Sequence, residues 1–131
     1  MTTTTAKTCA MSNASAKCSK TTVKMSREDA VEATRRRALW RLSEDGKSIT
    51  RAFVAKDWRA AMKFLNDVSA VAEEEGHHPD VKITNYRDVE VALRTHAIDG
   101  LSNADFDVAE KIDATCEATY SPKWAREHGL E

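Results

Sequence analysis

Residues 57–96 read DWRAAMKFLNDVSAVAEEEGHHPDVKITNYRDVEVALRTH. In the first half, small and apolar residues recur at three- and four-residue steps, at Trp58, Ala61, Met62, Leu65, Val68, Ser69 and Ala72. This spacing predicts one amphipathic helix over residues 57–75. Gly76 follows at a position that favours a left-handed C-cap, and Pro79 prevents the helix from resuming.

The residues after Pro79 alternate between apolar and polar, which predicts two strands joined by a turn. Val81 and Ile83 belong to the first strand. The second strand has one face formed by Val89, Val91, Leu93 and Thr95, and an opposite face formed by Glu90, Ala92, Arg94 and His96. His96 is therefore expected at the end of a strand, on its polar side.

The sequence on either side of residues 57–96 predicts two further helices and a β-hairpin. Ser26 begins a helix that is expected to end near Arg36, and Asp45-Gly46 is a strong hairpin signal between strands 38–42 and 49–55. A last helix is expected to begin at Ser102, to carry the residues Phe106, Ala109, Ile112, Asp113 and Cys116, and to be closed by Pro122. The order predicts an α+β fold, a four-stranded antiparallel sheet with three helices packed on one face.

The length of 131 residues corresponds to one domain. Residues 1–25 contain no Asp, Glu or Arg and lack apolar periodicity, so we expect a disordered N-terminal extension. The absence of Arg argues against a mitochondrial transit peptide. The folded domain is expected over residues 26–120, and residues 121–131 are expected to form a polar C-terminal tail.

The composition excludes several classes of protein. The net charge is −1 and the charges are mixed, so neither a nucleic-acid arm nor a membrane-surface patch is indicated. The run Arg35-Arg36-Arg37 is better explained as a solvated helix end. No stretch is long and apolar enough for a membrane span. Three cysteines without a C-x-x-C spacing favour a reduced intracellular protein. We expect a cytoplasmic location, with a nuclear one as the alternative and organelle import disfavoured.

Three of the four histidines fall within twenty residues, at His77, His78 and His96. Histidine titrates near neutral pH, so such a cluster favours a site that moves protons. The side chains of adjacent His77 and His78 diverge, which leaves one to orient the site and the other to do chemistry. Three histidines could instead hold zinc, but neither an H-x-H nor an H-E-x-x-H spacing is present, and we expect no metal.

The nearby carboxylates and aromatic residue also have purely structural explanations. Glu73 belongs to an acidic run on an exposed helix face, but carboxylates at a helix C-terminus are mildly unfavourable, which favours a task such as orienting a histidine. Asp105 is placed to cap the last helix and can face the site at the same time. Tyr86 is expected to pack against the sheet. His128, in the expected tail, is assigned no role.

The spaced set of these residues resembles the signature of the pterin-4a-carbinolamine dehydratase family. It consists of Glu73, His77-His78-Pro79, Tyr86, His96 and Asp105. The resemblance extends over roughly residues 26–115 and includes Trp40, Ile49-x-Arg51-x-Phe53, Asp57-Trp58, Thr95-His96 and Gly100-Leu101-Ser102. The family fold, helices on one side of a four-stranded antiparallel sheet, agrees with the pattern described above.

The resemblance implies a hydro-lyase that converts 4a-hydroxytetrahydropterin to quinonoid dihydropterin in tetrahydrobiopterin recycling. The reaction delivers a proton to the departing hydroxyl and removes one from a ring nitrogen, so it needs no cofactor. By similarity, His77 and His96 are the acid–base pair, in an order that stays open, and His78 holds the pterin. Asp105 and Glu73 would orient the histidines.

The pocket lining implied by the resemblance adds Pro79, Arg94, Thr95 and Ala97. Two positions depart from the family pattern: Ala97 replaces a frequent acidic residue, and Gly76 replaces a frequent polar one. Both departures affect the polarity of the pocket and leave the histidines in place.

The family also suggests a second class of function, a protein-binding module. Some members are dimerisation cofactors of a transcription factor, and others are assembly factors in organelles. The presence of all three histidines favours the enzyme, because a scaffold has no chemical need for them. A homo-oligomer, either a dimer or a tetramer, is expected, since a small open sheet has exposed edges.

Overall fold

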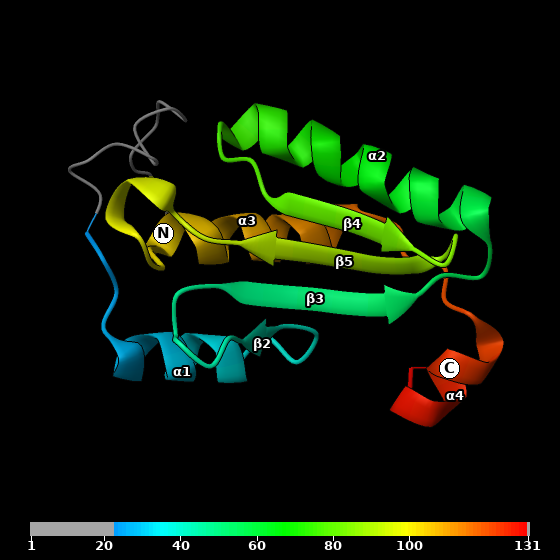
Figure 1. The fold of residues 1–131 in the computed structure, drawn as a ribbon, viewed down its shortest axis with the longest axis horizontal. Coiled ribbons are helices and arrows are strands. Elements are labelled where there is room, and N and C mark those ends of the chain that lie inside the picture. Colours follow the sequence, from blue (N-terminus) through cyan, green and yellow to red (C-terminus); the bar gives the residue numbers. More distant parts are fainter. Residues whose placement is uncertain (1–22, 131) are drawn as a thin grey trace.

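The computed structural model describes residues 23–130, and the predicted α+β architecture is confirmed (Figure 1). Its elements are α1 Arg27–Arg35, β2 Arg41–Leu42, β3 Ile49–Val54, α2 Trp58–Glu75, β4 Asp80–Thr84, β5 Asp88–Leu93, the short 3-10 helix η2 His96–Ile98, α3 Asn103–Thr115 and α4 Pro122–His128. The four strands form one antiparallel sheet in the order β2-β3-β5-β4. Most of the expected N-terminal extension, residues 1–22, lies outside the described part. The backbone N–H of Met25 already donates to the carbonyl of Leu101 at 2.7 Å, so packing begins at this residue.

One face of the sheet carries the core. Along β3 and β5 the buried residues alternate with more exposed ones, and each face is continuous because the register pairs Arg51 with Val91 and Phe53 with Val89. The helices α2 and α3 cover the apolar face (Figure 1). Within residues 23–130, no helix covers most of the opposite face, which carries Thr50 and Glu90 (Figure 1). The predicted alternation in these two strands is confirmed.

The first strand is shorter than expected. The prediction of a strand over residues 38–42 holds only for Arg41–Leu42. Upstream of it the chain turns, with the backbone N–H of Trp40 donating to the carbonyl of Arg37 at 2.9 Å. Trp40 is nevertheless buried, and its indole N–H donates to Asp113 at 3.1 Å. The side chain is therefore anchored by α3 and not by strand pairing.

The fourth helix, α4, was not predicted from the sequence. Pro122 occupies the first turn of this helix and does not merely close the previous one, and Ser121 caps it through a 3.5 Å bond from the N–H of Trp124. The preceding segment is tied to the end of β3, where Ser121 N donates to the carbonyl of Val54 at 2.8 Å. Trp124 then packs on Tyr120, with ring centroids 5.1 Å apart. This aromatic contact holds the expected tail against the sheet.

The helix α2 was predicted correctly in extent, and Asp57 is its N-cap. The buried stripe, however, is rotated relative to the prediction. Ala61, Val68 and Ala72 are buried as predicted. Trp58, however, is 53% exposed and Ser69 is exposed, while the additional buried residues are Phe64, Val71 and Glu75. The contact with β3 determines this face, because the ring of Phe64 meets that of Phe53 edge-on at 4.8 Å.

The end of α2 determines where the histidines begin. Gly76 is the C-cap in a left-handed conformation, with φ 65 and ψ 28, as predicted. Gly76→Ala is expected to lower the free energy of unfolding by about 1 kcal/mol, because a Cβ is strained at positive φ. Denaturant unfolding would measure this. The matched control is Gly129→Ala, which changes the same conformation at the end of α4, φ +68, far along the chain from the three clustered histidines. An unchanged stability of Gly76→Ala would contradict the expectation.

Candidate active site

His77 and Asp105 form the buried centre of the site. The His77 ring is 4% exposed and its Nε2 lies 2.5 Å from Oδ1 of Asp105, which is fully buried. The other carboxylate oxygen, Oδ2, accepts from the hydroxyl of Thr95 at 2.7 Å and from the backbone N–H of Ser102 at 3.0 Å. The end of α2, the end of β5 and the start of α3 therefore meet at one carboxylate.

This network determines the chemistry available to the His77 ring. Since a carboxylate only accepts hydrogen bonds, Nε2 carries the proton that points to Asp105. In this tautomer Nδ1 is the acceptor nitrogen of the ring. Asp105 also closes the capping box with Ser102 that was predicted from the sequence. The same carboxylate thus caps a helix and orients a histidine.

The second histidine points away from the first, as predicted for adjacent residues. The His78 side chain is 62% exposed, and its Nε2 lies 2.5 Å from Oε2 of Glu73, one helical turn earlier. Glu73 therefore orients His78, which is the kind of task expected for a carboxylate at this helix end. The buried pair and the exposed pair are held by separate carboxylates.

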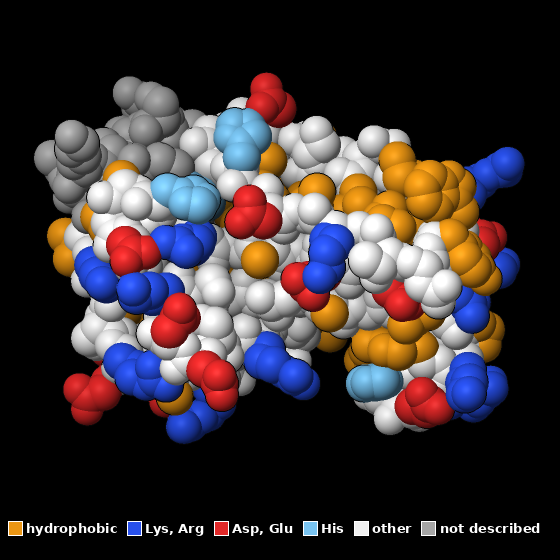
Figure 2. Space-filling model, in the orientation of Figure 1, with side chains coloured by type: hydrophobic (Ala, Val, Ile, Leu, Met, Phe, Trp, Pro, Cys, Tyr) orange, Lys and Arg blue, Asp and Glu red, His pale blue; other side chains and the backbone are white. Residues whose placement is uncertain are grey.

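His96 comes from a different element. It begins η2 directly after Thr95, which is 1% exposed, and its own side chain is exposed. Thr95 is paired with Gly100 across the loop, with Thr95 N donating to Gly100 O at 2.8 Å. Figure 2 shows two histidine side chains close together on one face of the molecule and another far from them, over the region of α4. The exposed histidines that follow α2 and β5 thus lie at the same end of the sheet.

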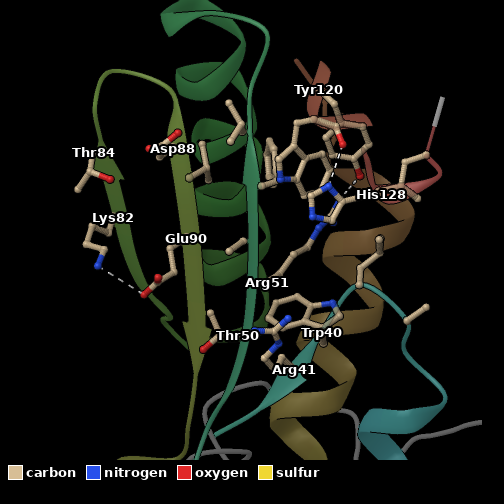
Figure 3. Close-up of a pocket in the computed structure, with 18 residues that line it drawn as sticks. Trp40, Arg41, Thr50, Arg51, Lys82, Thr84, Asp88, Glu90, Tyr120 and His128 are labelled. Carbon is tan, nitrogen blue, oxygen red and sulfur yellow. Dashed lines mark hydrogen bonds and ion pairs between the residues drawn. The ribbon is translucent and has the colours of Figure 1, made fainter. Parts of the chain in front are cut away.

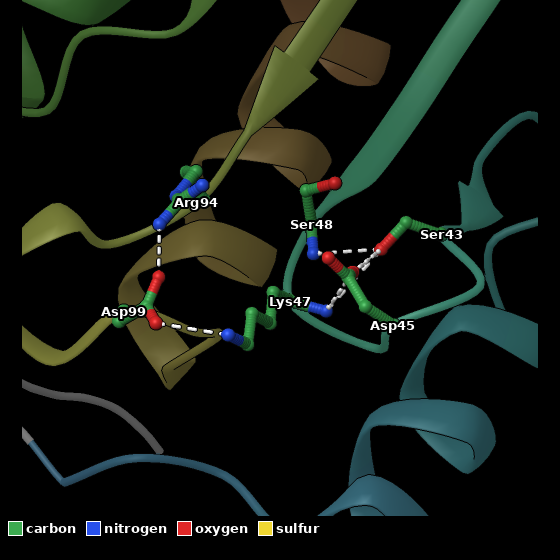
Figure 4. A network of polar contacts seen from close by, with 6 residues as sticks. All are labelled: Ser43, Asp45, Lys47, Ser48, Arg94 and Asp99. Atoms are coloured by element: carbon green, nitrogen blue, oxygen red, sulfur yellow. Dashed lines mark hydrogen bonds and ion pairs between the residues drawn. The ribbon is translucent and has the colours of Figure 1, made fainter.

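Arg94, two residues before His96 in the chain, is anchored by a loop carboxylate (Figure 4). Its guanidinium pairs with Asp99, which also accepts from Lys47 Nζ at 2.9 Å. The bond from Lys47 holds the pKa of Asp99 below its ordinary value. The ion pair between Lys47 and Asp99 was not predicted from the sequence. It forms only because the turn between β2 and β3 packs against the loop after β5.

The other predicted pocket residues are adjacent to the histidines along the chain. Pro79 follows His78 and Ala97 follows His96. Neither takes part in the hydrogen bonds that join His77, Thr95 and Asp105 within the described residues.

Lys111 fixes the approach of α3 to the end of α2. Its Nζ lies 3.0 Å from Oε1 of Glu74 and 3.0 Å from Oε2 of Glu75, just before the C-cap. These hydrogen bonds, that of Glu74 first, raise the pKa of Lys111. These two ion pairs hold α3 against the end of α2 and so contribute to the placement of His77 opposite Asp105. In the sequence, Lys111, Glu74 and Glu75 look like ordinary surface charges, so no sequence pattern predicts that they pair.

Tyr86 lies outside the histidine cluster, and the prediction that it packs on the sheet is wrong. It is 53% exposed and stands in the turn between β4 and β5. Asn85 and Tyr86 both have positive φ, 49 and 56, as a tight hairpin turn requires. The turn directs the side chain outward, where the guanidinium of Arg87 lies 5.4 Å from the ring centroid.

A hollow of about 680 Å³ lies elsewhere, on the open face of the sheet beside α4 (Figure 3). Trp40, Tyr120 and His128 line it, and none of the three clustered histidines does. Arg51 supports its floor through bonds of 2.8 Å to Asp113 and 2.9 Å to the Tyr120 hydroxyl. Burial raises the pKa of Asp113. The hollow is thus separate from the histidine chemistry.

Residues 23–130 contain neither a cluster of metal-binding side chains nor a membrane-spanning helix. No group of three or more His, Cys, Asp or Glu side chains there is arranged to hold a metal ion. None of the helices in that part of the chain is long and apolar enough to cross a bilayer.

Comparisons with known proteins identify the family. The family model described as pterin 4 alpha carbinolamine dehydratase matches residues 23–115. A protein of Nostoc punctiforme named "Putative pterin-4-alpha-carbinolamine dehydratase" is 47% identical over 73 residues, which are 56% of this chain and 75% of the relative. A protein of the same name from Halorhodospira halophila is 43% identical over 75 residues, which are 57% of this chain and 68% of the relative.

A solved structure is also similar. The crystal structure of a transcriptional coactivator/pterin dehydratase from Brucella melitensis matches with a TM-score of 0.66 and 29% identity, over 72% of this chain and 100% of the other. The matched region contains the whole sheet and all three clustered histidines. The chain therefore belongs to the pterin 4 alpha carbinolamine dehydratase family.

Proposed function

We propose that this protein is a dehydratase that converts 4a-hydroxytetrahydropterin to quinonoid dihydropterin, in the recycling of tetrahydrobiopterin. The observation that carries the proposal is the buried Asp105–His77 pair, at the same end of the sheet as the exposed His78 and His96. Two histidines from different elements supply the two proton transfers that this reaction needs.

The reaction balances without a cofactor. One histidine donates a proton to the hydroxyl on C4a, the C–O bond breaks, and water leaves. The other removes a proton from the neighbouring ring nitrogen, and the electron pair of that N–H bond forms the new double bond to C4a. We assign these steps to His77 and His96. Asp105 orients the His77 ring through the 2.5 Å contact with Nε2.

The rest of the site is proposed to bind the substrate. His78, held by Glu73, would contact the pterin ring, and Pro79, Arg94, Thr95 and Ala97 would line the pocket beside the two proton-transferring histidines. Thr95 is fixed by its bond to Asp105, and Arg94 by its pair with Asp99. Such anchored side chains lose little conformational freedom when a ligand binds.

The test is the dehydration rate of 4a-hydroxytetrahydropterin with and without the protein. We expect wild type to accelerate the step above its spontaneous rate. His128→Ala is the matched control, because His128 stacks on Trp124 at 4.1 Å and lies away from the cluster. Its rate should equal that of wild type. A folded wild-type protein that gives no acceleration would contradict the proposal.

A protein-binding role is the second candidate. It is favoured by the similarity to the Brucella melitensis protein, whose description includes transcriptional coactivator. The two roles are compatible, since the histidine network occupies one end of the sheet and leaves the open face exposed. We also propose that the chain forms a homo-oligomer.

A further inference from the structure

The loop that carries His96 has little packing of its own. It consists of η2 and Asp99, and none of the three residues of η2, all in the described part of the chain, is buried. The ends of the loop are fixed, because Thr95 N donates to Gly100 O at 2.8 Å and a Cβ on Gly100 would lie 2.6 Å from Cε of Lys24. Packing therefore fixes the two ends and leaves His96 on an exposed segment between them.

Asp99 supplies the contacts that packing does not provide (Figure 4). Its Oδ1 accepts from the guanidinium of Arg94, and its Oδ2 accepts from Nζ of Lys47 at 2.9 Å. Arg94 directly follows β5, and Lys47 belongs to the turn between β2 and β3. One carboxylate thus joins the exposed segment to two other parts of the fold.

The backbone of Asp99 is in a left-handed conformation, with φ 48 and ψ 53. Residues with a Cβ are disfavoured there, although Asp tolerates it better than most, and glycine adopts it freely. The glycine of this loop is the next residue, Gly100, which is not among the described residues with positive φ. The strained position therefore coincides with the side chain that makes the contacts, which is typical of a residue held in place for function.

Lys47 is a fixed partner because its turn has its own hydrogen bonds. The backbone N–H of Lys47 donates to Oδ1 of Asp45 at 3.0 Å, and the N–H of Ser48 donates to the hydroxyl of Ser43 at 3.1 Å. That hydroxyl donates in turn to Asp45 at 2.6 Å. The bond from Lys47 lowers the pKa of Asp99, so this carboxylate is charged at neutral pH.

We propose that Asp99 is a positioning residue, whose carboxylate holds the loop where His96 can transfer its proton. The inference rests on the proposed function, in which His96 is one of the two proton-transferring groups. Such a group must lie within hydrogen-bond reach of the atom it serves, and a displacement of about 1 Å can lower a rate about 10²-fold. Exposed ion pairs contribute little to global stability, so the effect of Asp99 is expected on the position of His96 and not on folding.

Asp99→Gly separates position from folding. Glycine suits the left-handed backbone, so the unfolding midpoint should stay near that of wild type, while the loss of the carboxylate should lower kcat about tenfold and change KM by less than about twofold. Asp99→Asn tolerates the same backbone and keeps one acceptor oxygen, so its kcat should fall by less. An unchanged kcat in Asp99→Gly, with or without a rise in KM, would overturn the proposal.

The dependence on His96 is tested in a His96→Ala background. If Asp99 acts through this ring, Asp99→Gly should cause no further fall in kcat there, because the group that it positions is absent. A fall as large as in the wild-type background would show that the carboxylate acts elsewhere, and the assignment would be wrong.

Lys47→Met tests the contact without a change in the loop and without any activity. The backbone N–H groups of Ile98 and Asp99 each form a hydrogen bond of 3.2 Å at η2. Loss of the Lys47 contact should make these two amides exchange their hydrogens severalfold faster, with the exchange of the buried Ala109 amide in α3 unchanged. Wild-type exchange rates in Lys47→Met would overturn the proposal.

Lys63→Met is the matched control. Lys63 also pairs with two carboxylates, Asp67 at 3.1 Å and Glu117 at 3.3 Å, but it lies in the first half of α2. It should leave the exchange of the loop amides and kcat as in wild type, and an equal acceleration in both variants would also overturn the proposal. If wild type does not dehydrate the pterin, the proposed function fails, and the exchange rates alone decide whether Asp99 holds the loop.

Discussion

His77→Gln is expected to lower kcat for dehydration by about 10²–10⁴-fold, the range that one general acid or base contributes. Glutamine can still donate a hydrogen bond to Asp105, so the buried network keeps a partner, but its amide does not exchange protons near neutral pH. The loss would thus report chemistry and not unfolding. Stopped-flow measurement of the dehydration step, with circular dichroism as the check on folding, gives both quantities.

His96 is expected to act separately, because it is exposed and comes from a different element. His96→Ala should lower kcat with almost no change in stability, and the double variant should approach the spontaneous rate. A double variant that retains wild-type activity would contradict the assignment of both residues. If only one single variant is impaired, water or another group makes the second proton transfer, and the pairing of His77 with His96 is wrong.

The sequence predicts the sheet and the extent of α2 well because both depend on local periodicity. Val89, Val91 and Leu93 alternate over a full strand, and the glycine C-cap marks the helix end without any information from the rest of the chain. The rotation of the α2 face could not be predicted in the same way. It depends on the contact between Phe64 and Phe53, two residues in different elements, which periodicity alone does not specify.

In the candidate site, too, some features follow from the local sequence and others depend on contacts between distant residues. The divergence of His77 and His78 follows from their adjacency, and the Asp105 cap follows from its position after Ser102. The bond between Asp105 and His77, at 2.5 Å, joins residues twenty-eight positions apart and requires α3 to pack against the end of α2. The turn between β4 and β5 was predicted, but the positive φ of Asn85 and Tyr86 was not, because neither residue is glycine, although asparagine tolerates positive φ better than most residues.

Asp105→Ala is expected to have the largest effect on stability, roughly 3–5 kcal/mol, because it removes a fully buried carboxylate that accepts hydrogen bonds from three groups. The donors are the His77 ring, the Thr95 hydroxyl and the Ser102 backbone N–H. Denaturant unfolding measures the change. Asn103→Ala, at an exposed position of the same helix, is the matched control and should stay within about 0.5 kcal/mol of wild type.

Asp105→Asn separates the structural role of this residue from its role in the reaction. The asparagine oxygen can still accept from Thr95 and Ser102, while its NH₂ group faces Nε2 of His77. That contact is satisfied only if the imidazole proton moves to Nδ1, which removes the acceptor that the proposed reaction uses. We expect a modest loss of stability together with a fall in kcat of about 10²-fold or more. Equal losses of activity and folded protein would instead show that Asp105 only caps α3.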